Sequence, residues 1–322
     1  MTRRQILAGG AAVAALGVAG AGYGCSRAVD HARARVTGRS RLIRTRFGAL
    51  EYAEAGSGPP LLMIHGTGGG FDQGLSFARG VIARGYRVIA PSRFGYLRSD
   101  FPDDPSSENQ ADALVELLDH LEIERLSVAG GSAGALSAVQ FALRHPDRCS
   151  GLILLVPAAN VRGRDPVEMT PTARFLVELL ARSDFLFWAA FNTVPDRLIE
   201  TLLATDPSLL ETASEAERAR AYRILEELMP ISLRSCGMLN DARLAGSPAR
   251  ADFRLIAVPT LVISVEDDRF GTAATSRDIA AAVPGARLVI YPSGGHIWLG
   301  HDDDVSGEIA RFVGSAGSHA AR

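Results

Sequence analysis

The stretch VAGGSAGALS, residues 128–137, places Ser132 between glycines, directly after an apolar run and directly before residues that favour a helix. The run LSVA before it predicts a buried strand, and ALSAVQFALRH after it predicts a helix. A serine within G-x-S-x-G at such a strand-to-helix turn is held in a strained conformation with its hydroxyl exposed. The pattern predicts that Ser132 is a nucleophile, and an ordinary tight turn is the alternative.

A serine hydroxyl attacks well only when a base accepts its proton and an acid orients that base. The run PTLVISV ends at Glu266, Asp267 and Asp268, and the run ARLVIYP leads into a glycine-rich loop that carries His296. Both loops would lie at the carboxyl edge of a parallel sheet, beside Ser132. The order serine, acid, histidine is the one expected for this motif.

The segment HGTGGGFDQG, residues 65–74, follows the apolar run LLMI and predicts a bend rich in free backbone N–H groups. Such groups can stabilise the oxyanion that forms when a serine attacks a carbonyl. Phosphate binding is the competing interpretation, but the segment lacks the G-x-x-x-x-G-K pattern and its lysine. We interpret His65 as a structural residue that holds this loop.

From about residue 40 onward, short apolar runs alternate with amphipathic segments, which predicts an α/β fold with a mostly parallel sheet flanked by helices. Ser107 and Gln110 match a capping box at the start of one such helix. The alternation stops over 161–250, where only helical patterns occur. We therefore expect a core formed by 37–160 and 251–322, with a helical lid of residues 161–250 inserted after the sixth strand.

The first 36 residues have the anatomy of a leader: Arg3 and Arg4 precede an Ala/Gly-rich apolar run over 6–23. The start resembles a twin-arginine export signal, with Ala19-Gly20-Ala21 as a cleavage site, and predicts a periplasmic or extracellular protein. One alternative is an uncleaved anchor that associates with the membrane through residues 6–23. Another is lipid attachment at Cys25, for which Gly22 is a poor upstream residue.

Composition narrows the function classes. The chain has 322 residues, 47% of them hydrophobic, and a formal net charge of −2, so it can bury a large core. It has no basic, aromatic-rich patch for nucleic acid. Three scattered cysteines predict neither a disulfide framework nor a structural zinc site. We interpret Cys149 and Cys236 as buried apolar residues.

Together, HGTGGG, GYRVIAPSRFGYLRSD, GGSAG, RHPDR, VPTLVISVEDD and PSGGH resemble the α/β-hydrolase superfamily over residues 45 to 315. The resemblance is to the lid-bearing branch that holds esterases, cofactor-free perhydrolases and carbon–carbon bond hydrolases. It implies an α/β-hydrolase fold, Asp268 as the acid, and the backbone N–H groups of Thr67 and Ala133 as oxyanion donors. The sequence departs from many members at Ser92, where they have Asp, and we interpret this as a difference in loop anchoring.

These residues predict a serine hydrolase that cleaves a small carboxylic ester or similar acyl compound through Ser132, His296 and Asp268. No metal or organic cofactor is required by that chemistry. The same triad could instead cleave a carbon–carbon bond next to a ketone or form a peracid. From a different class, the chain could be an inactive hydrolase scaffold that serves as a binding or sensor protein.

Overall fold

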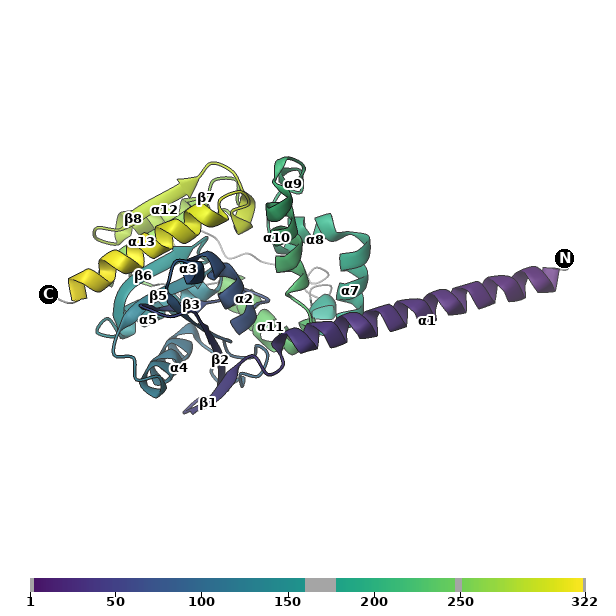
Figure 1. The fold of residues 1–322 in the computed structure, drawn as a ribbon, viewed down its shortest axis with the longest axis horizontal. Coiled ribbons are helices and arrows are strands. Elements are labelled where there is room, and N and C mark those ends of the chain that lie inside the picture. Colours follow the sequence, from purple (N-terminus) through teal and green to yellow (C-terminus); the bar gives the residue numbers. More distant parts are fainter. Residues whose placement is uncertain (1–2, 160–177, 247–250, 321–322) are drawn as a thin grey trace.

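The computed structural model describes residues 3–159, 178–246 and 251–320, and these form an eight-stranded sheet with helices on both faces (Figure 1). The strand order is β1-β2-β4-β3-β5-β6-β7-β8. The first two strands pair antiparallel and β2 is antiparallel to β4, whereas all later pairs are parallel. The strands are β1 (Arg41–Thr45), β2 (Gly48–Ala55), β3 (Pro60–Ile64), β4 (Arg87–Pro91), β5 (Leu126–Gly131), β6 (Cys149–Leu155), β7 (Thr260–Val265) and β8 (Arg287–Tyr291).

Two hydrophobic cores lie on opposite faces of this sheet, because successive strand residues point to opposite sides. Leu62 and Ile64 pack on one face, whereas Leu61 and Met63 pack on the other. The first face is covered by α4 (Ser107–His120), α5 (Gly134–Arg144) and α12 (Thr272–Ala282). The second is covered by α2 (Phe71–Phe77), α3 (Arg79–Ala83) and α13 (Asp302–Ala320). Burial on both faces explains the near-continuous apolar runs of the central strands.

Helix α4 begins one residue earlier than the capping-box pattern predicts. Its N-cap is Ser106, whose hydroxyl accepts a hydrogen bond from the Asn109 N–H at 3.3 Å. Gln110 does not reach back to the helix start, because its side-chain oxygen accepts from the Phe94 N–H at 2.7 Å. The predicted box was therefore wrong by one position, since the adjacent serine satisfies the first turn.

In its described part, the chain between β6 and β7 contains helices and loops but no strand. Residues 178–182 are helical, and α7 (Asp184–Thr193), α8 (Pro195–Leu202), α9 (Leu209–Thr212), α10 (Glu215–Glu226) and α11 (Ser235–Gly246) follow. A 3-10 turn, η1 (Ile231–Leu233), separates the last two helices. We call the described residues 178–246 the helical insertion, and its role as a lid stays a prediction.

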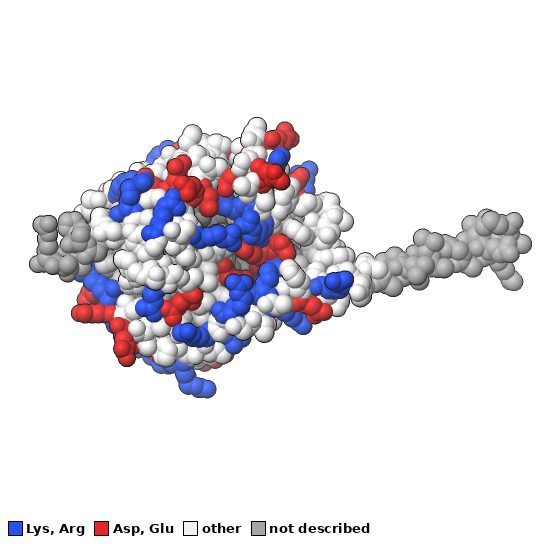
Figure 2. All heavy atoms as spheres, viewed as in Figure 1, with Lys and Arg blue, Asp and Glu red and all other residues white. Residues whose placement is uncertain are grey.

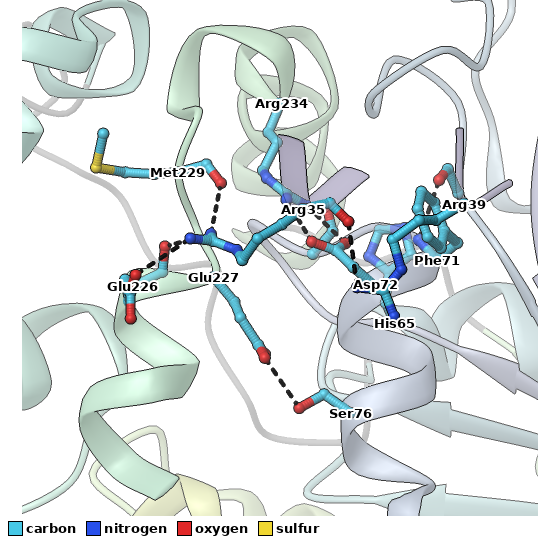
Figure 3. A network of polar contacts seen from close by, with 12 residues as sticks. Arg35, Arg39, His65, Phe71, Asp72, Ser76, Glu226, Glu227, Met229 and Arg234 are labelled. Carbon is cyan, nitrogen blue, oxygen red and sulfur yellow. Dashed lines mark hydrogen bonds and ion pairs between the residues drawn. The ribbon is translucent and has the colours of Figure 1, made fainter. Parts of the chain in front are cut away.

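Polar contacts join the helical insertion to α1 (Arg3–Val36) and to the core (Figure 3). Arg35 near the end of α1 donates to the backbone oxygens of Glu226 and Met229 at 3.0 and 3.1 Å. Arg234, which is fully buried, donates to the Asp72 carboxylate on α2 at 2.7 Å. The insertion is therefore hydrogen-bonded to α1 on one side and to Asp72 of α2 on the other.

Part of α1 belongs to the packed structure. Cys25, Ala32 and Val36 are buried, and the helix contacts α7. Among the described residues, no helix combines the length and the apolarity that crossing a membrane requires. Basic and acidic side chains are interspersed on the face shown in Figure 2. The leader, its cleavage and the absence of a nucleic-acid partner stay predictions.

Candidate active site

Ser132 lies at the turn between β5 and α5 with a backbone φ of +50°. Neighbouring glycines permit this turn because other side chains would collide there. A Cβ at Gly134 would stand 2.4 Å from the backbone oxygen of His65, and one at Gly130 would stand 2.7 Å from the Gly134 oxygen. The close approach of β5, α5 and the loop after β3 thus requires the G-x-S-x-G pattern, and it places strain at Ser132.

His296 joins Ser132 to Asp268 in an unbroken chain of hydrogen bonds. The Ser132 Oγ lies 2.9 Å from His296 Nε2, and His296 Nδ1 lies 2.8 Å from Asp268 Oδ2. Because the carboxylate can only accept at Nδ1, that nitrogen carries the proton and Nε2 is left to accept from the serine hydroxyl. Residues 132, 268 and 296, predicted from separate loops, therefore meet in the geometry of a nucleophile, its base and an orienting acid.

Asp268 is buried and held in its ionised form. Burial would raise the pKa of its carboxyl, but the interaction with the neighbouring imidazole of His296 and the hydrogen bonds that the carboxylate accepts outweigh burial and lower the pKa. These bonds come from His296, from the Thr272 hydroxyl and from the Phe270 N–H, the last at 2.9 Å. The ring of Phe270 in turn stands edge-on to His296 with centroids 4.9 Å apart. Hydrogen bonds thus fix the Asp268 carboxylate, and the Phe270 ring packs against the imidazole that this carboxylate orients.

Asp267 has a structural task that sequence reasoning missed. Its carboxylate accepts from the Gly295 N–H at 2.8 Å, from the Gly294 N–H at 3.3 Å and from the Ser293 hydroxyl at 2.7 Å. These residues form the loop that presents His296. Asp268 therefore holds the imidazole of His296, whereas Asp267 holds the loop that carries it. The sequence contained both acids and the loop, but no pattern assigned the second acid to it.

The expected oxyanion donors lie beside Ser132. A Cβ at Gly66 would stand 3.2 Å from the Ser132 Cβ, so the loop that carries Thr67 passes directly over the serine. Ala133 follows the serine at the start of α5 and is buried. Within the described ranges, neither the Thr67 N–H nor the Ala133 N–H donates to a protein acceptor. Both remain available to a developing oxyanion.

His65 supports this loop from beneath. Its Nε2 accepts from the Arg93 N–H at 2.9 Å, so Nδ1 carries the proton and donates to the Gly66 oxygen at 2.7 Å. Burial, followed by the nearby charge of Arg93, lowers the pKa of His65 well below its usual range. His65 is therefore neutral and holds the loop in place, in agreement with its interpretation as a structural residue.

Ser92 shows how the unusual loop after β4 is anchored. Its hydroxyl accepts from the Phe71 N–H at 3.0 Å and donates to the buried Glu51 carboxylate at 2.9 Å. Glu51 also accepts from the Arg98 side chain at 2.7 Å. A carboxylate on β2 thus supports this loop through the serine hydroxyl, which agrees with the interpretation of Ser92 as part of the loop's anchoring.

The cysteines lie away from this site. Cys149 is buried on β6, and burial raises the pKa of its thiol to about 12, so it is not a nucleophile near neutral pH. Cys236 is exposed, which contradicts its interpretation as a buried residue. It lies at the start of α11, where the helix turns its second residue outward.

A cavity of about 320 Å³ opens beside Ser132 and His296. Core and insertion both line it with apolar side chains, among them Phe77, Val156, Leu203, Ile224, Met238 and Trp298. None of its described lining residues is an arginine, and the chain contains no lysine. The aromatic-rich stretch DFLFWAAF on α7 supplies none of the described lining.

Comparisons with known proteins agree with this architecture. A family model described as alpha/beta hydrolase fold matches residues 59–300. The chain is 29% identical over 279 residues to a 2-hydroxy-6-oxononadienedioate/2-hydroxy-6-oxononatrienedioate hydrolase from Paraburkholderia xenovorans, covering 80% of this chain and 89% of the relative. It is 27% identical over 270 residues to the hydrolase YcgS from Bacillus subtilis, covering 81% and 93%.

Among solved structures, an alpha/beta hydrolase fold protein from Nakamurella multipartita superposes with a TM-score of 0.65 at 26% identity. That alignment covers 86% of this chain and 99% of the other. The family model matches most of the chain, and the eight-stranded sheet and its flanking helices agree with it. The chain therefore belongs to the α/β-hydrolase fold family and is similar to proteins that are named hydrolases.

Proposed function

We propose that this protein is a serine hydrolase that cleaves an uncharged carboxylic ester through an acyl-enzyme. His296, oriented by Asp268, removes the proton of Ser132 as its oxygen attacks the ester carbonyl. The N–H groups of Thr67 and Ala133 stabilise the oxyanion, and the imidazolium then protonates the departing alcohol. Water activated by His296 attacks the acyl-enzyme and releases the acid. The observation that carries the proposal is the continuous hydrogen-bonded chain from Ser132 to Asp268.

The cavity supports an uncharged substrate. A carboxylate-bearing substrate desolvated in an apolar cavity needs a cationic partner, and the described lining offers none. Its one carboxylate, Asp241, is already paired with Arg93. An ester with apolar acyl and alcohol parts meets no such cost.

Carbon–carbon bond hydrolysis is the second candidate, because a relative of this chain is named as a hydrolase of an oxo-dienedioate. Such a substrate carries two carboxylates, which fits the described cavity poorly. A steady-state comparison separates the two candidates. We expect 4-nitrophenyl esters to be turned over faster as the acyl chain lengthens from acetate to a medium length, and a 2-hydroxy-6-oxo-dienoate to be turned over at least ~100-fold more slowly. Turnover of the dienoate with inert esters would reverse the assignment.

An inactive scaffold that only binds ligands is the remaining class. Such a protein would bind substrate-like esters without releasing nitrophenol. The continuous hydrogen bonds from Ser132 through His296 to Asp268 favour an enzyme instead. The same assay therefore separates the enzyme from a binding protein.

We also propose export through the leader, with an uncleaved membrane anchor as the alternative. Arg3 and Arg4 before a weakly apolar run support the twin-arginine route. Replacing both with lysine should hold a reporter fusion inside the cell. Equal export of the two fusions would exclude this route.

A further inference from the structure

A buried ion pair joins the helical insertion to Arg93, which lies in the loop after β4. The Asp241 carboxylate on α11 accepts from both terminal nitrogens of Arg93, each at 2.6 Å. The Tyr96 hydroxyl donates to the same carboxylate at 2.5 Å. All three side chains are buried, and Asp241 also lines the cavity. The mechanism proposed above assigns no task to any of them.

The remaining donors of Arg93 hold two consecutive peptide groups of the loop that carries Thr67. Its Nε donates to the His65 oxygen at 3.0 Å, and Nη2 donates to the Gly66 oxygen at 3.1 Å. The Gly66 C=O and the Thr67 N–H belong to one planar trans peptide, so they point in opposite directions. Fixing the Gly66 oxygen therefore fixes the direction of the Thr67 N–H.

We propose that Asp241 and Arg93 are positioning residues for the oxyanion donor, so that docking of the helical insertion on the core sets the geometry of the catalytic loop. This inference rests on the proposed function. Asp241 holds the guanidinium in one orientation through a bidentate pair, and the guanidinium holds the loop. Helix α11 also places Met238, Leu239 and Ala242 in the cavity wall. One helix thus couples the wall that contacts substrate to the group that stabilises the transition state.

Two substitutions test the coupling. Asp241→Asn keeps the shape and one acceptor but removes the charge and the second acceptor. Arg93→Lys keeps the positive charge but loses the planar fork that reaches both oxygens. We expect each to lower kcat for a 4-nitrophenyl ester about 10- to 100-fold, with KM changed less than about threefold, because the donor acts mainly in the transition state. The affinity for phenylboronic acid, which forms a tetrahedral adduct with serine, should fall by a similar factor.

Asp112→Asn is the matched control. Asp112 is also buried and also pairs with an arginine, Arg144, at 2.8 Å, but it lies on α4 away from the active site. It should lower the melting temperature and leave kcat and boronate affinity within about twofold of wild type. Melting temperatures of all variants, measured beside the kinetics, separate loss of fold from loss of positioning.

The inference is overturned if folded Asp241→Asn and Arg93→Lys proteins keep wild-type kcat, or if kcat and boronate affinity fall as much in Asp112→Asn. In either case wild-type ester turnover would leave the proposed function standing. Absence of ester turnover and of boronate binding in the wild type would instead overturn the proposed function, and this inference with it.

Discussion

Asp267 and Asp268 are adjacent in the chain, but their carboxylates contact different groups and have different expected roles. The side chain of Asp268 reaches His296, whereas that of Asp267 reaches the backbone of the loop before it. Asp268→Asn should lower kcat about 10⁴-fold, because an amide no longer holds the imidazole in the required tautomer. Asp267→Asn keeps one acceptor for the loop and should lower kcat only about tenfold. Ester kinetics of the two variants test this, and a larger loss at 267 than at 268 would exchange the roles.

The residues of the candidate site could be predicted from the sequence because each carries a local signal. Ser132 has glycines around it, and His296 and the acids stand directly after apolar strands, where an α/β sheet collects its functional side chains. Asp241, Arg93 and Glu51 carry no such signal. Glu51 bonds to Ser92, 41 residues along the chain, and Arg93 pairs with Asp241, 148 residues along the chain, so only the folded arrangement brings these partners together.

At the scale of elements, the apolar runs LLMI, LSVA, PTLVISV and ARLVIYP predicted strands, and they correspond to β3, β5, β7 and β8. The β1-β2 hairpin was not predicted. Strand β1 is an edge strand whose residues are mostly exposed and include two arginines, so it lacks the apolar run that marks the buried strands. The insertion was predicted as helical from its 3.6-residue periodicity, but the partners of its helices could not be, because many apolar faces fit one another.

Glu227 follows α10 and faces α2 across the interface between insertion and core (Figure 3). Its Oε1 accepts from the Ser76 hydroxyl at 3.3 Å, whereas Oε2 is buried and has no partner among the described residues. Burial, with the charge of Asp72, raises the pKa of this carboxyl to about 7. The folded state thus holds a proton that the unfolded state releases near pH 4.5.

The raised pKa of Glu227 predicts how the free energy of unfolding changes with pH. Because the folded protein binds the extra proton, the contribution of Glu227 is most favourable below about pH 4.5 and is lost as the pH rises through about 7. Glu227→Gln should raise the free energy of unfolding by about 1–3 kcal/mol at pH 8 and change it little at pH 5. Urea unfolding at both pH values measures this, with Glu211→Gln as the exposed control. Equal effects at the two pH values would contradict it.

At the scale of the whole molecule, the leader expected over 1–36 and the packed part of α1 overlap. A side chain at Gly24 would meet Trp188 at 3.0 Å, and burial continues through Ala32 to Val36. Removing residues 2–21, up to the predicted cleavage site, should leave ester turnover and melting temperature unchanged. Removing 2–36 should lower the free energy of unfolding by about 2–4 kcal/mol, because it exposes the apolar surface of the insertion. Equal stability of the two proteins would show that this contact contributes nothing.

Ser132 Oγ is the proposed attacking atom, and labelling by a fluorophosphonate tests this role most directly. The wild-type protein should gain one phosphonyl group, located on Ser132 by peptide mass mapping, and lose ester turnover in proportion. Ser132→Ala should melt at or slightly above the wild-type temperature, since it removes one oxygen from a strained turn. It should take up no probe, with kcat lowered about 10⁶-fold. A folded Ser132→Ala protein that still takes up the probe or turns over ester at a comparable rate would contradict the account.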